Sequence, residues 1–457
     1  MYSKTDKSPL YPNCPTAEKL YEFASSLPII DYHNHLSIAD MADDTRIDSV
    51  YDLWIRPDPY KHRAMRMCGV AEKYITGAAS PEEKFQKWCE TVPKLIGNPL
   101  YVWTLAELRT VFGIKASPCG ENAAELYEFC NAYLKEHTVS PSTLLKRFGA
   151  EFVCPCMSVS DSADLLKKRE GAAPSLRCDD LLAPTCESIG KLEHAAGMRI
   201  RSLGGYEKAI RIRLRDFASC GSVFSDIALD DGFMFYDDDG KNADRFGLVL
   251  NGGVLCAEDK NRLFSGILRF LGETFAETGY VMQLHIGAQR YTSSVLREKV
   301  GPAGGFAAIG NGVNVKSLTR FLDTLDQKQK LPKTILFTLN PSDNAVFSVL
   351  SGSYSRDGVS GLITQGPAWW WCDHRYGIRE MLENAAAFGV LSNFVGMTTD
   401  SRSFLSFVRH DYFRRVLCDF LGEKFERNEL GCPYEDLKET VYRMCYRNAK
   451  DLCESHI

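Results

Sequence analysis

The sequence predicts an α/β protein built as a distorted (β/α)8 TIM-like barrel with a helical insertion after the first strand. Two observations lead to this prediction. Short β-rich runs recur along the chain, each followed by polar residues or by Gly and Pro, and segments with helical periodicity separate most of them. Alternating strands and helices are typical of a parallel sheet, and eight such units are typical of a closed barrel. The eight runs span residues 28–32, 151–154, 175–177, 222–225, 280–285, 334–338, 362–365 and 394–398.

The helical segments between these runs each carry one apolar face. In residues 206–218 and 261–278, apolar side chains recur every three or four positions. The stretch 37–148 has helical periodicity as well, for example at 81–91 and 122–135, and we interpret it as an insertion after the first strand. The chain then divides into residues 1–36 with an N-terminal helix and the first strand, 37–148 with the helical insertion or cap, and 149–457 with the remainder of the barrel.

The composition limits the kinds of partner. The chain has 457 residues, with 54 Lys and Arg against 59 Asp and Glu, which argues against a nucleic acid as the main partner. No window of about 18 uninterrupted apolar residues occurs, so we expect no membrane-spanning helix. The first residues lack the apolar core of a signal peptide, and the 16 cysteines form no CxxC pair, so we expect a cytoplasmic protein with reduced thiols. Cys154 and Cys156 form a lone CxC, which we interpret as too little for a zinc site.

Three histidines and one aspartate stand at the ends of predicted strands. His33 and His35 follow the first run, and in an extended chain side chains two residues apart point the same way. His285 ends the fifth run, and Asp400 follows the eighth. Each residue by itself also fits a structural role, as a hydrogen-bonded core histidine or as a surface ion pair of Asp400 with Arg402. Together, at the C-terminal mouth of a barrel, they predict a site for a divalent metal ion.

Aromatic and cationic residues also gather at predicted strand ends. Three of the six tryptophans, Trp369 to Trp371, follow the seventh run, where indole rings suit the C–H faces of a sugar, although at least one of them is expected to belong to the core. Arg177, Arg290 and a cation-rich segment around Tyr60 offer ways to hold an anionic substrate, because arginine binds carboxylates bidentately. Each arginine singly also fits a solvated surface position.

These motifs are specific enough to identify a resemblance. The chain resembles the uronate isomerase (glucuronate/galacturonate isomerase) family of the amidohydrolase superfamily, whose barrel is of the metal-dependent hydrolase type. The matching stretches are DYHNHL at 31–36, YKHRAMRMCGV at 60–70, TVPKLIGNPLYVWTLAELR at 91–109, PSLR at 174–177, MQLHIGAQR at 282–290, LPKTILFTLNPSDN at 331–344 and GMTTDSRSFLSFVRHDYFRRVLC at 396–418. They run through most of the chain, and the last of them is long and highly specific.

The resemblance implies an enzyme that interconverts the aldose and ketose forms of hexuronates, D-glucuronate to D-fructuronate and D-galacturonate to D-tagaturonate. It implies one divalent metal ion, with Zn²⁺ as the default for a His2Asp set and Fe²⁺ or Mn²⁺ as alternatives. The implied metal residues are His33, His35 and Asp400, with His285 near them. The implied substrate-site residues are Tyr60, Arg177, Arg290, Arg402, Trp369 and Trp370. The expected partner is a small sugar acid, and we expect the chain to form a homo-oligomer.

The chemistry of this reaction fits these residues. An aldose–ketose isomerisation moves a proton between C2 and C1 through an enediol or enediolate, and it needs a base, an electrophile at the carbonyl and a grip on the distal carboxylate. Asp400, Tyr60 and Arg402 are the catalytic candidates: Arg402 stabilises the enediolate, and the base is Asp400, Tyr60 or a hydroxide ion on the metal. Arg177 and Arg290 are the candidates that bind the substrate carboxylate.

The chain departs from the family pattern at the predicted rim of the site. Residues that are histidines or acids in the family are replaced by Pro59, Val102, Leu105, Met157, Ser158 and Ile227. This loss leaves an isomerase for a different sugar acid, or one with reduced turnover, as an alternative. A metal-dependent hydrolase of the same superfamily is the second alternative, although Ile227 stands where such enzymes carry a carboxylated Lys as a further ligand. A degenerate sugar-binding protein, the third, predicts lost metal residues.

Overall fold

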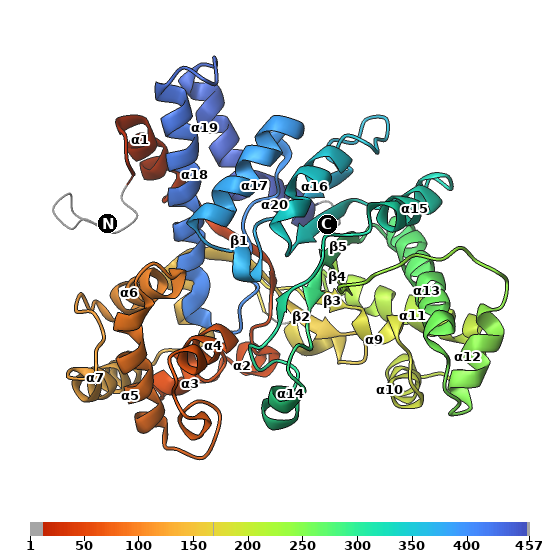
Figure 1. Ribbon diagram of the computed structural model, residues 1–457, viewed down its shortest axis with the longest axis horizontal. Helices are drawn as coiled ribbons and strands as arrows, with labels where there is room; N and C mark the ends of the chain where they lie inside the picture. Colours follow the sequence, from red (N-terminus) through yellow and green to blue (C-terminus); the bar gives the residue numbers. More distant parts are fainter. Residues whose placement is uncertain (1–11, 168, 455–457) are drawn as a thin grey trace.

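The computed structural model of the protein describes residues 12–167 and 169–454. At its centre lies a curved sheet of seven parallel strands in the order β1-β2-β3-β4-β5-β8-β9 (Figure 1). The strands are β1 (Ile29–Asn34), β2 (Ala150–Ser158), β3 (Ser175–Arg177), β4 (Phe224–Leu229), β5 (Val281–Ile286), β8 (Thr334–Thr338) and β9 (Ile363–Gln365). Two short antiparallel strands, β6 (Ala288–Gln289) and β7 (Ala308–Ile309), form a separate ribbon.

Seven of the eight predicted runs form strands of this sheet. All residues of β5 and β8 are buried, as expected for parallel strands that are covered on both faces. The fourth strand begins at Phe224 rather than Ser222 and extends to Leu229. This shift places Asp226 inside β4, where its side chain points to the face of the sheet that carries the histidines.

The prediction of an eighth strand at 394–398 is wrong. Residues 394–400 have no strand pairing, although they lie beside β1, where the Asp400 N–H donates to His33 O (3.1 Å). Gly396 adopts a φ of +95°, and a Cβ at this position would lie 2.2 Å from a main-chain oxygen of a neighbouring helix. Asp400 is also left-handed, with a φ of +45°. Two departures from extended geometry within five residues prevent a regular ladder.

Side chains hold the 394–400 segment to β1. Asp31 Oδ1 accepts hydrogen bonds from Thr398 Oγ1 (2.9 Å) and from the Thr399 N–H (2.6 Å). His410, on helix α18 (Val408–Glu426), lies 3.2 Å from the same oxygen. Burial by itself raises the pKa of Asp31, but His410 and Thr399 outweigh it and lower that pKa, so the carboxylate stays charged.

Seven helices separate β1 from β2, and α3 to α7 form the lower left of the molecule in Figure 1. Several begin at residues that suit a helix N-terminus: Ser80 forms a capping box with Glu83, and Asp58 accepts from the N–H groups of Tyr60 and Lys61. The helices are α2 (Ile38–Asp43), α3 (Val50–Trp54), α4 (Pro59–Met67), α5 (Pro81–Thr91), α6 (Pro99–Phe112), α7 (Ala123–Glu136) and α8 (Pro141–Phe148).

The remaining helices surround the sheet. Helix α1 (Pro15–Ala24) packs against α18, where the Asn13 N–H donates to Asp419 Oδ1 (2.9 Å). The others are α9 (Asp179–Leu182), α10 (Cys186–Ala196), α11 (Leu203–Ala218), α12 (Asn242–Leu250), α13 (Ala257–Thr278), α14 (Ser294–Val300), α15 (Val315–Asp326), α16 (Asn344–Leu350), α17 (Arg375–Phe388), α19 (Tyr434–Tyr442) and α20 (Asn448–Glu454).

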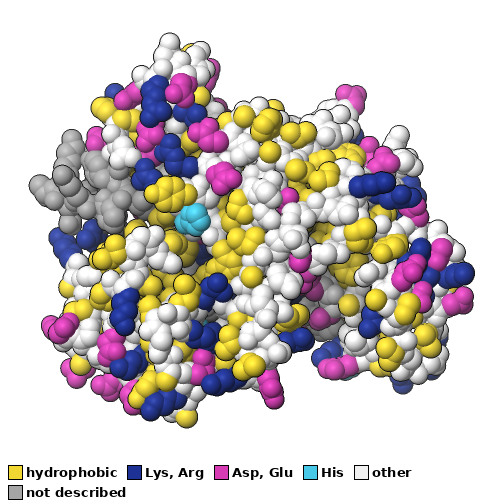
Figure 2. Space-filling view, viewed as in Figure 1, with side chains coloured by type: hydrophobic (Ala, Val, Ile, Leu, Met, Phe, Trp, Pro, Cys, Tyr) yellow, Lys and Arg dark blue, Asp and Glu magenta, His cyan; other side chains and the backbone are white. Residues whose placement is uncertain are grey.

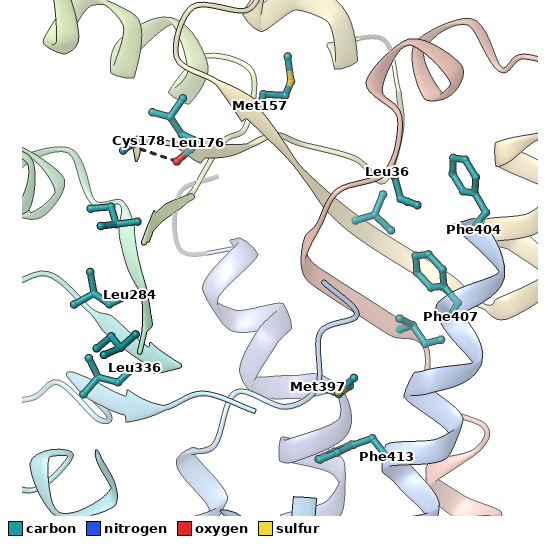
Figure 3. Packing of buried hydrophobic residues seen from close by; sticks show 14 of the residues in the cluster. Leu36, Met157, Leu176, Cys178, Leu284, Leu336, Met397, Phe404, Phe407 and Phe413 are labelled. Carbon is teal, nitrogen blue, oxygen red and sulfur yellow. Dashed lines mark hydrogen bonds between the residues drawn. The ribbon is translucent and has the colours of Figure 1, made fainter. Parts of the chain in front are cut away.

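Hydrophobic clusters cover both faces of the sheet. In the outer cluster, Figure 3 shows Leu284 and Leu336 on adjacent strands and Met397 beside Phe413 of α18. Met157, at the end of β2, belongs to the same cluster. The inner cluster consists of Ile30, Tyr32, Cys154, Val223, Phe224, Val281, Ile335, Phe337 and Val395, with Ala449, Leu452 and Cys453 of α20. Because most of these inner residues stand early in their strands, the C-terminal ends of the strands are left for polar groups.

Acidic and basic side chains are interspersed on the face shown in Figure 2. On this face, Lys and Arg do not gather into one separate patch. Within residues 12–167 and 169–454, every helix is too short or too polar to cross a lipid bilayer.

Candidate active site

A cavity of about 590 Å³ opens at the C-terminal ends of the strands. His35 and Asp400 lie at its floor, and three arginines line it further out. Part of its wall comes from the start of α4, and another part from the chain between α14 and β7. This volume lies within the range of about 300–1,000 Å³ that is usual for small-molecule sites.

The imidazoles after β1 meet the carboxylate of Asp400 at this floor. Nε2 of His33 lies 3.2 Å from Asp400 Oδ1, and Nε2 of His35 lies 3.0 Å from the same oxygen. Burial by itself lowers the pKa of His35, but the negative charge of Cys156 and the contact with Asp400 raise it to about 9. The metal-free site therefore holds protonated imidazoles, and a cation that binds here displaces these protons.

An irregularity in β1 aims these residues. The pairing of β1 with β2 changes register between Asp31 and Asn34. As a result, two adjacent residues reach the inner face: Tyr32 belongs to the inner cluster, and the His33 ring lies 4.6 Å from the His285 ring, measured between centroids. Such irregularities re-aim side chains and are common next to active sites.

Cys156, Asp226 and His285 approach His33 from neighbouring strands. Cys156 Sγ lies 3.4 Å from His33 Nδ1 and 3.6 Å from Asp226 Oδ2, and His285 Nδ1 lies 2.8 Å from Asp226 Oδ1. The ligand atoms of His33, His35 and Cys156 all lie within 4.8 Å of one another, and so do those of His33, Asp226 and His285. The interpretation of the CxC pair as too little for a zinc site therefore overlooked partners that come from other strands.

The residues present fit a bound cation. His285 is 3% exposed, yet its Nε2 has no hydrogen-bond partner among the described residues. Its Nδ1 lies 2.8 Å from Asp226 Oδ1. A buried polar atom without a partner is costly, and two ligands of one cation approach each other in this way. Imidazole, carboxylate and thiol groups together suit Zn²⁺ or another first-row divalent metal.

Two indoles hold Asp400 in place. Trp369 Nε1 donates to Asp400 Oδ2 at 2.5 Å, and Trp370 Nε1 donates to the same oxygen at 2.7 Å. Burial raises the pKa of Asp400, but the bonds to His33 and His35 outweigh it and hold that pKa well below its usual range. Trp370 has a φ of +48°, which is rare for a bulky residue, and strained conformations of this kind concentrate at functional sites.

The three tryptophans divide between packing and the cavity. Trp369 is 5% exposed, lies 4.8 Å from His285 between ring centroids, and does not line the cavity. Trp370 and Trp371 do line it, and the Arg290 guanidinium lies 5.4 Å from the Trp370 ring. Trp369 is therefore placed to orient Asp400, whereas Trp370 faces the space that a substrate would fill.

The predicted arginines differ in their charge environment. Arg177 Nη2 lies 2.7 Å from Asp179 Oδ2, and Arg290 Nε lies 2.7 Å from Asp230 Oδ1. Arg402 is exposed in the cavity and forms no ion pair with a carboxylate in the described part of the chain. Arg177 and Arg290 therefore enter the cavity as ion pairs, and Arg402 adds an uncompensated positive charge. The two aspartates were not singled out by the sequence.

Tyr60 stands at the cavity wall, one residue after the start of α4. Its hydroxyl is buried and has no hydrogen-bond partner among residues 12–167 and 169–454. Arg409, which forms a buried ion pair with Asp373, lies 5.7 Å from its ring. Burial raises the pKa of Tyr60 well above its usual value, so its hydroxyl keeps its proton at neutral pH. Sequence reasoning missed the Arg409–Asp373 pair, although Arg409 lies within the matching stretch 396–418.

The six family departures are spread over different environments. Pro59 lines the cavity, whereas Val102, Leu105, Met157, Ser158 and Ile227 do not. Met157 and Ile227 belong to the outer hydrophobic cluster, on the face of the sheet away from the histidines. Five of these substitutions therefore lie outside the cavity wall itself.

Comparisons with known proteins identify the family of the chain. Residues 10–453 match the family model described as glucuronate isomerase. The chain is 40% identical to a uronate isomerase of Bacillus licheniformis, over 95% of this chain and 94% of that protein, and 37% identical to one of Endomicrobium trichonymphae, over 97% of each. A crystal structure of a uronate isomerase from Thermotoga maritima superposes with a TM-score of 0.91, at 28% identity, over 99% of this chain and 100% of that one. The chain belongs to the uronate isomerase family and is an isomerase of hexuronates.

Proposed function

We propose that this protein is a metal-dependent aldose–ketose isomerase that converts D-glucuronate to D-fructuronate and D-galacturonate to D-tagaturonate. The observation that carries the proposal is the meeting of His33, His35 and Asp400 at the floor of a cavity with three arginines in its wall. Family membership supports the reaction class, and the volume of the cavity suits a single sugar acid.

His33, His35 and Asp400 hold one divalent cation, with His285 beside them. Zn²⁺ is the default for this set, and Fe²⁺ or Mn²⁺ is the alternative. When bound, the cation supplies Lewis-acid polarisation of the substrate oxygens. The two indole N–H groups on Asp400 Oδ2 fix the carboxylate so that Oδ1 stays aimed at the imidazoles.

Asp400, Tyr60 and Arg402 carry the proton transfer. The Asp400 carboxylate accepts the proton from C2 of the aldose and returns it to C1, while the hydroxyl proton on O2 passes to O1. The Tyr60 hydroxyl, which keeps its own proton, donates a hydrogen bond to the carbonyl oxygen as negative charge develops there. The guanidinium of Arg402, which forms no ion pair among the described residues, stabilises the enediolate.

Arg177 and Arg290 bind the distal carboxylate of the substrate at the outer part of the cavity. Both are held in position by acidic partners, Asp179 and Asp230, which also offer acceptors for sugar hydroxyls. The ring of Trp370 provides an apolar surface for the C–H face of the sugar. Fixing the substrate at both ends aligns C1 and C2 with the floor.

The finer architecture follows from the same proposal. Residues 394–400 take the position of an eighth strand next to β1, so that the seven-stranded sheet completes a distorted (β/α)8 barrel. Residues 37–148 then act as a cap that contributes Pro59 and Tyr60 to the cavity wall. Of the predicted divisions 1–36 and 149–457, the described residues form the barrel, and residues 1–11, 168 and 455–457 lie outside the described part of the chain.

The test is a substrate screen with metal-reconstituted protein. Formation of ketose from D-glucuronate or D-galacturonate supports the proposal, and removal of the metal by a chelator should abolish it. Ketose formation that persists after complete chelation would contradict the metal dependence. Activity on ester or amide substrates alone would favour the hydrolase alternative. Isomerisation of another sugar acid alone would show that the proposed substrate is wrong and the proposed reaction type is right.

A further inference from the structure

Cys156 lies on the inner face of the sheet, at the end of β2. Its neighbour Met157 points into the outer cluster (Figure 3). Because successive side chains of a strand point to opposite faces, Cys156 points toward the histidines. The observed contact agrees, since its sulfur lies 3.4 Å from His33 Nδ1.

The distances around Cys156 are those of ligands of one cation. In a tetrahedral zinc site, Zn–S is about 2.3 Å and Zn–N about 2.0–2.1 Å, which separates sulfur and nitrogen by about 3.6 Å. The measured separation from His33 is 3.4 Å, and the ligand atoms of His33, His35 and Cys156 all lie within 4.8 Å of one another. A second observation lies beside it: Nε2 of buried His285 has no hydrogen-bond partner among the described residues, and the His285 ring lies 4.6 Å from the His33 ring, measured between centroids.

We propose that Cys156 is a direct ligand, as a thiolate, of the cation held by His33 and His35. This inference rests on the metal dependence in the proposed function and adds one residue to that site. His33 meets Cys156 at Nδ1 and Asp400 at Nε2, so both side chains lie beside the imidazole that holds the cation. His35 contacts Asp400 at 3.0 Å and keeps that carboxylate at the site in either case.

A thiolate ligand has a chemical consequence for metal choice. Sulfur is a soft ligand that favours Zn²⁺ or Fe²⁺ over Mn²⁺ and Mg²⁺, which prefer oxygen. The residue at this place in the chain therefore sets metal preference. Cys156→Ser replaces the sulfur by a hydroxyl of similar shape, so it removes the soft ligand with little change in packing.

Cobalt substitution reads out the bond directly. Co²⁺ is added in one equivalent to the chelator-stripped, reduced protein, and the absorption spectrum is recorded. The visible d–d bands report that the metal is bound, and a near-ultraviolet charge-transfer band reports a sulfur–cobalt bond. Cys154→Ser is the matched control, since Cys154 is a buried thiol of the same strand in the inner hydrophobic cluster.

We expect both kinds of band in the wild type and in Cys154→Ser, and loss of the charge-transfer band alone in Cys156→Ser. The affinity of that variant for Zn²⁺ should fall by at least about tenfold, the lower end of what loss of an outer-sphere partner costs. The wild-type spectrum alone can refute the proposal. If it shows d–d bands without a charge-transfer band, the metal is bound without sulfur, because a thiol that only accepts a hydrogen bond from His33 produces no charge-transfer band. Persistence of the band in Cys156→Ser overturns it equally. Failure to bind cobalt at all would instead overturn the metal dependence in the proposed function, and this inference with it.

Discussion

The indole of Trp369 offers a sharp test of how the site is held together. Its Nε1–H donates to Asp400 Oδ2 at 2.5 Å, and the ring is buried outside the cavity lining. Trp369→Phe removes this donor and keeps an aromatic ring in the same place. The carboxylate then retains only Trp370 as an indole donor, and its orientation toward the imidazoles is less well fixed.

The size of the effect follows from the bond that is lost. A hydrogen bond to a charged group contributes about 1.5–3 kcal/mol. Loss of an outer-sphere partner typically lowers metal affinity about 10–100-fold, which corresponds to about 1.4–2.8 kcal/mol. The two ranges overlap, so Trp369→Phe should raise the dissociation constant of Zn²⁺ by about 10–100-fold.

The assay is a competition titration of Zn²⁺ against a chromophoric chelator at fixed pH. Trp371→Phe is the matched control, because its Nε1 has no hydrogen-bond partner among the described residues and it does not contact Asp400 through a hydrogen bond. It should keep the wild-type affinity within about twofold. An unchanged affinity in Trp369→Phe, or an equal loss in both variants, would refute the reasoning.

Three further predictions address activity, stability and pH. Asp400→Ala should abolish ketose formation from both hexuronates, and full activity in this variant would remove Asp400 from the mechanism. Lys61 Nζ lies 2.6 Å from Asp58 Oδ2 and 3.5 Å from Glu107 Oε2, and all three side chains are buried. Lys61→Met leaves two buried carboxylates without their cation, so it should lower the free energy of unfolding, measured by urea denaturation, by about 3–5 kcal/mol. A loss below about 1 kcal/mol would contradict this. In the metal-free protein the pKa of His35 is raised to about 9, so its stabilising contribution is complete below about pH 6.5 and is lost as the pH rises toward 9. The melting temperature of chelated protein should fall over this range while the affinity for Zn²⁺ rises; parallel changes in both would contradict the assignment.

Strands such as β5 and β8 were predictable because each is a short, mostly apolar run that is buried on both faces, and composition alone reveals such a run. The failure at 394–398 has a local cause. Gly396 and Asp400 adopt left-handed backbone conformations that depend on contacts with a distant helix and with β1. The run from Phe394 to Thr398 is rich in residues that favour strands, so composition could not distinguish this segment from a strand.

The site was predictable where its chemistry sits in a local motif, as in the HxH of His33 and His35. Cys156 and Asp226 gave no such signal. Their partners lie on other strands, and only the sheet brings a sulfur within 3.4 Å of an imidazole more than a hundred positions away. A polar residue on a strand that neighbours a metal motif is therefore a candidate ligand when the alternation of the strand places it on the inner face. This holds even where the residue forms no motif with its own neighbours in the sequence.

Side chains form most of the hydrogen bonds between β1 and residues 394–400, where a main-chain ladder would normally run. Asp31 accepts three of those hydrogen bonds, from Thr398 and Thr399, and the contacts of His33 and His35 with Asp400 follow next to them. The proposed metal ligands His33, His35 and Asp400 therefore also connect the first strand with the segment at 394–400. Metal binding at these residues should therefore also stabilise the contact between β1 and residues 394–400. A substitution that alters the reactivity of His33, His35 or Asp400 should change the stability of this contact as well.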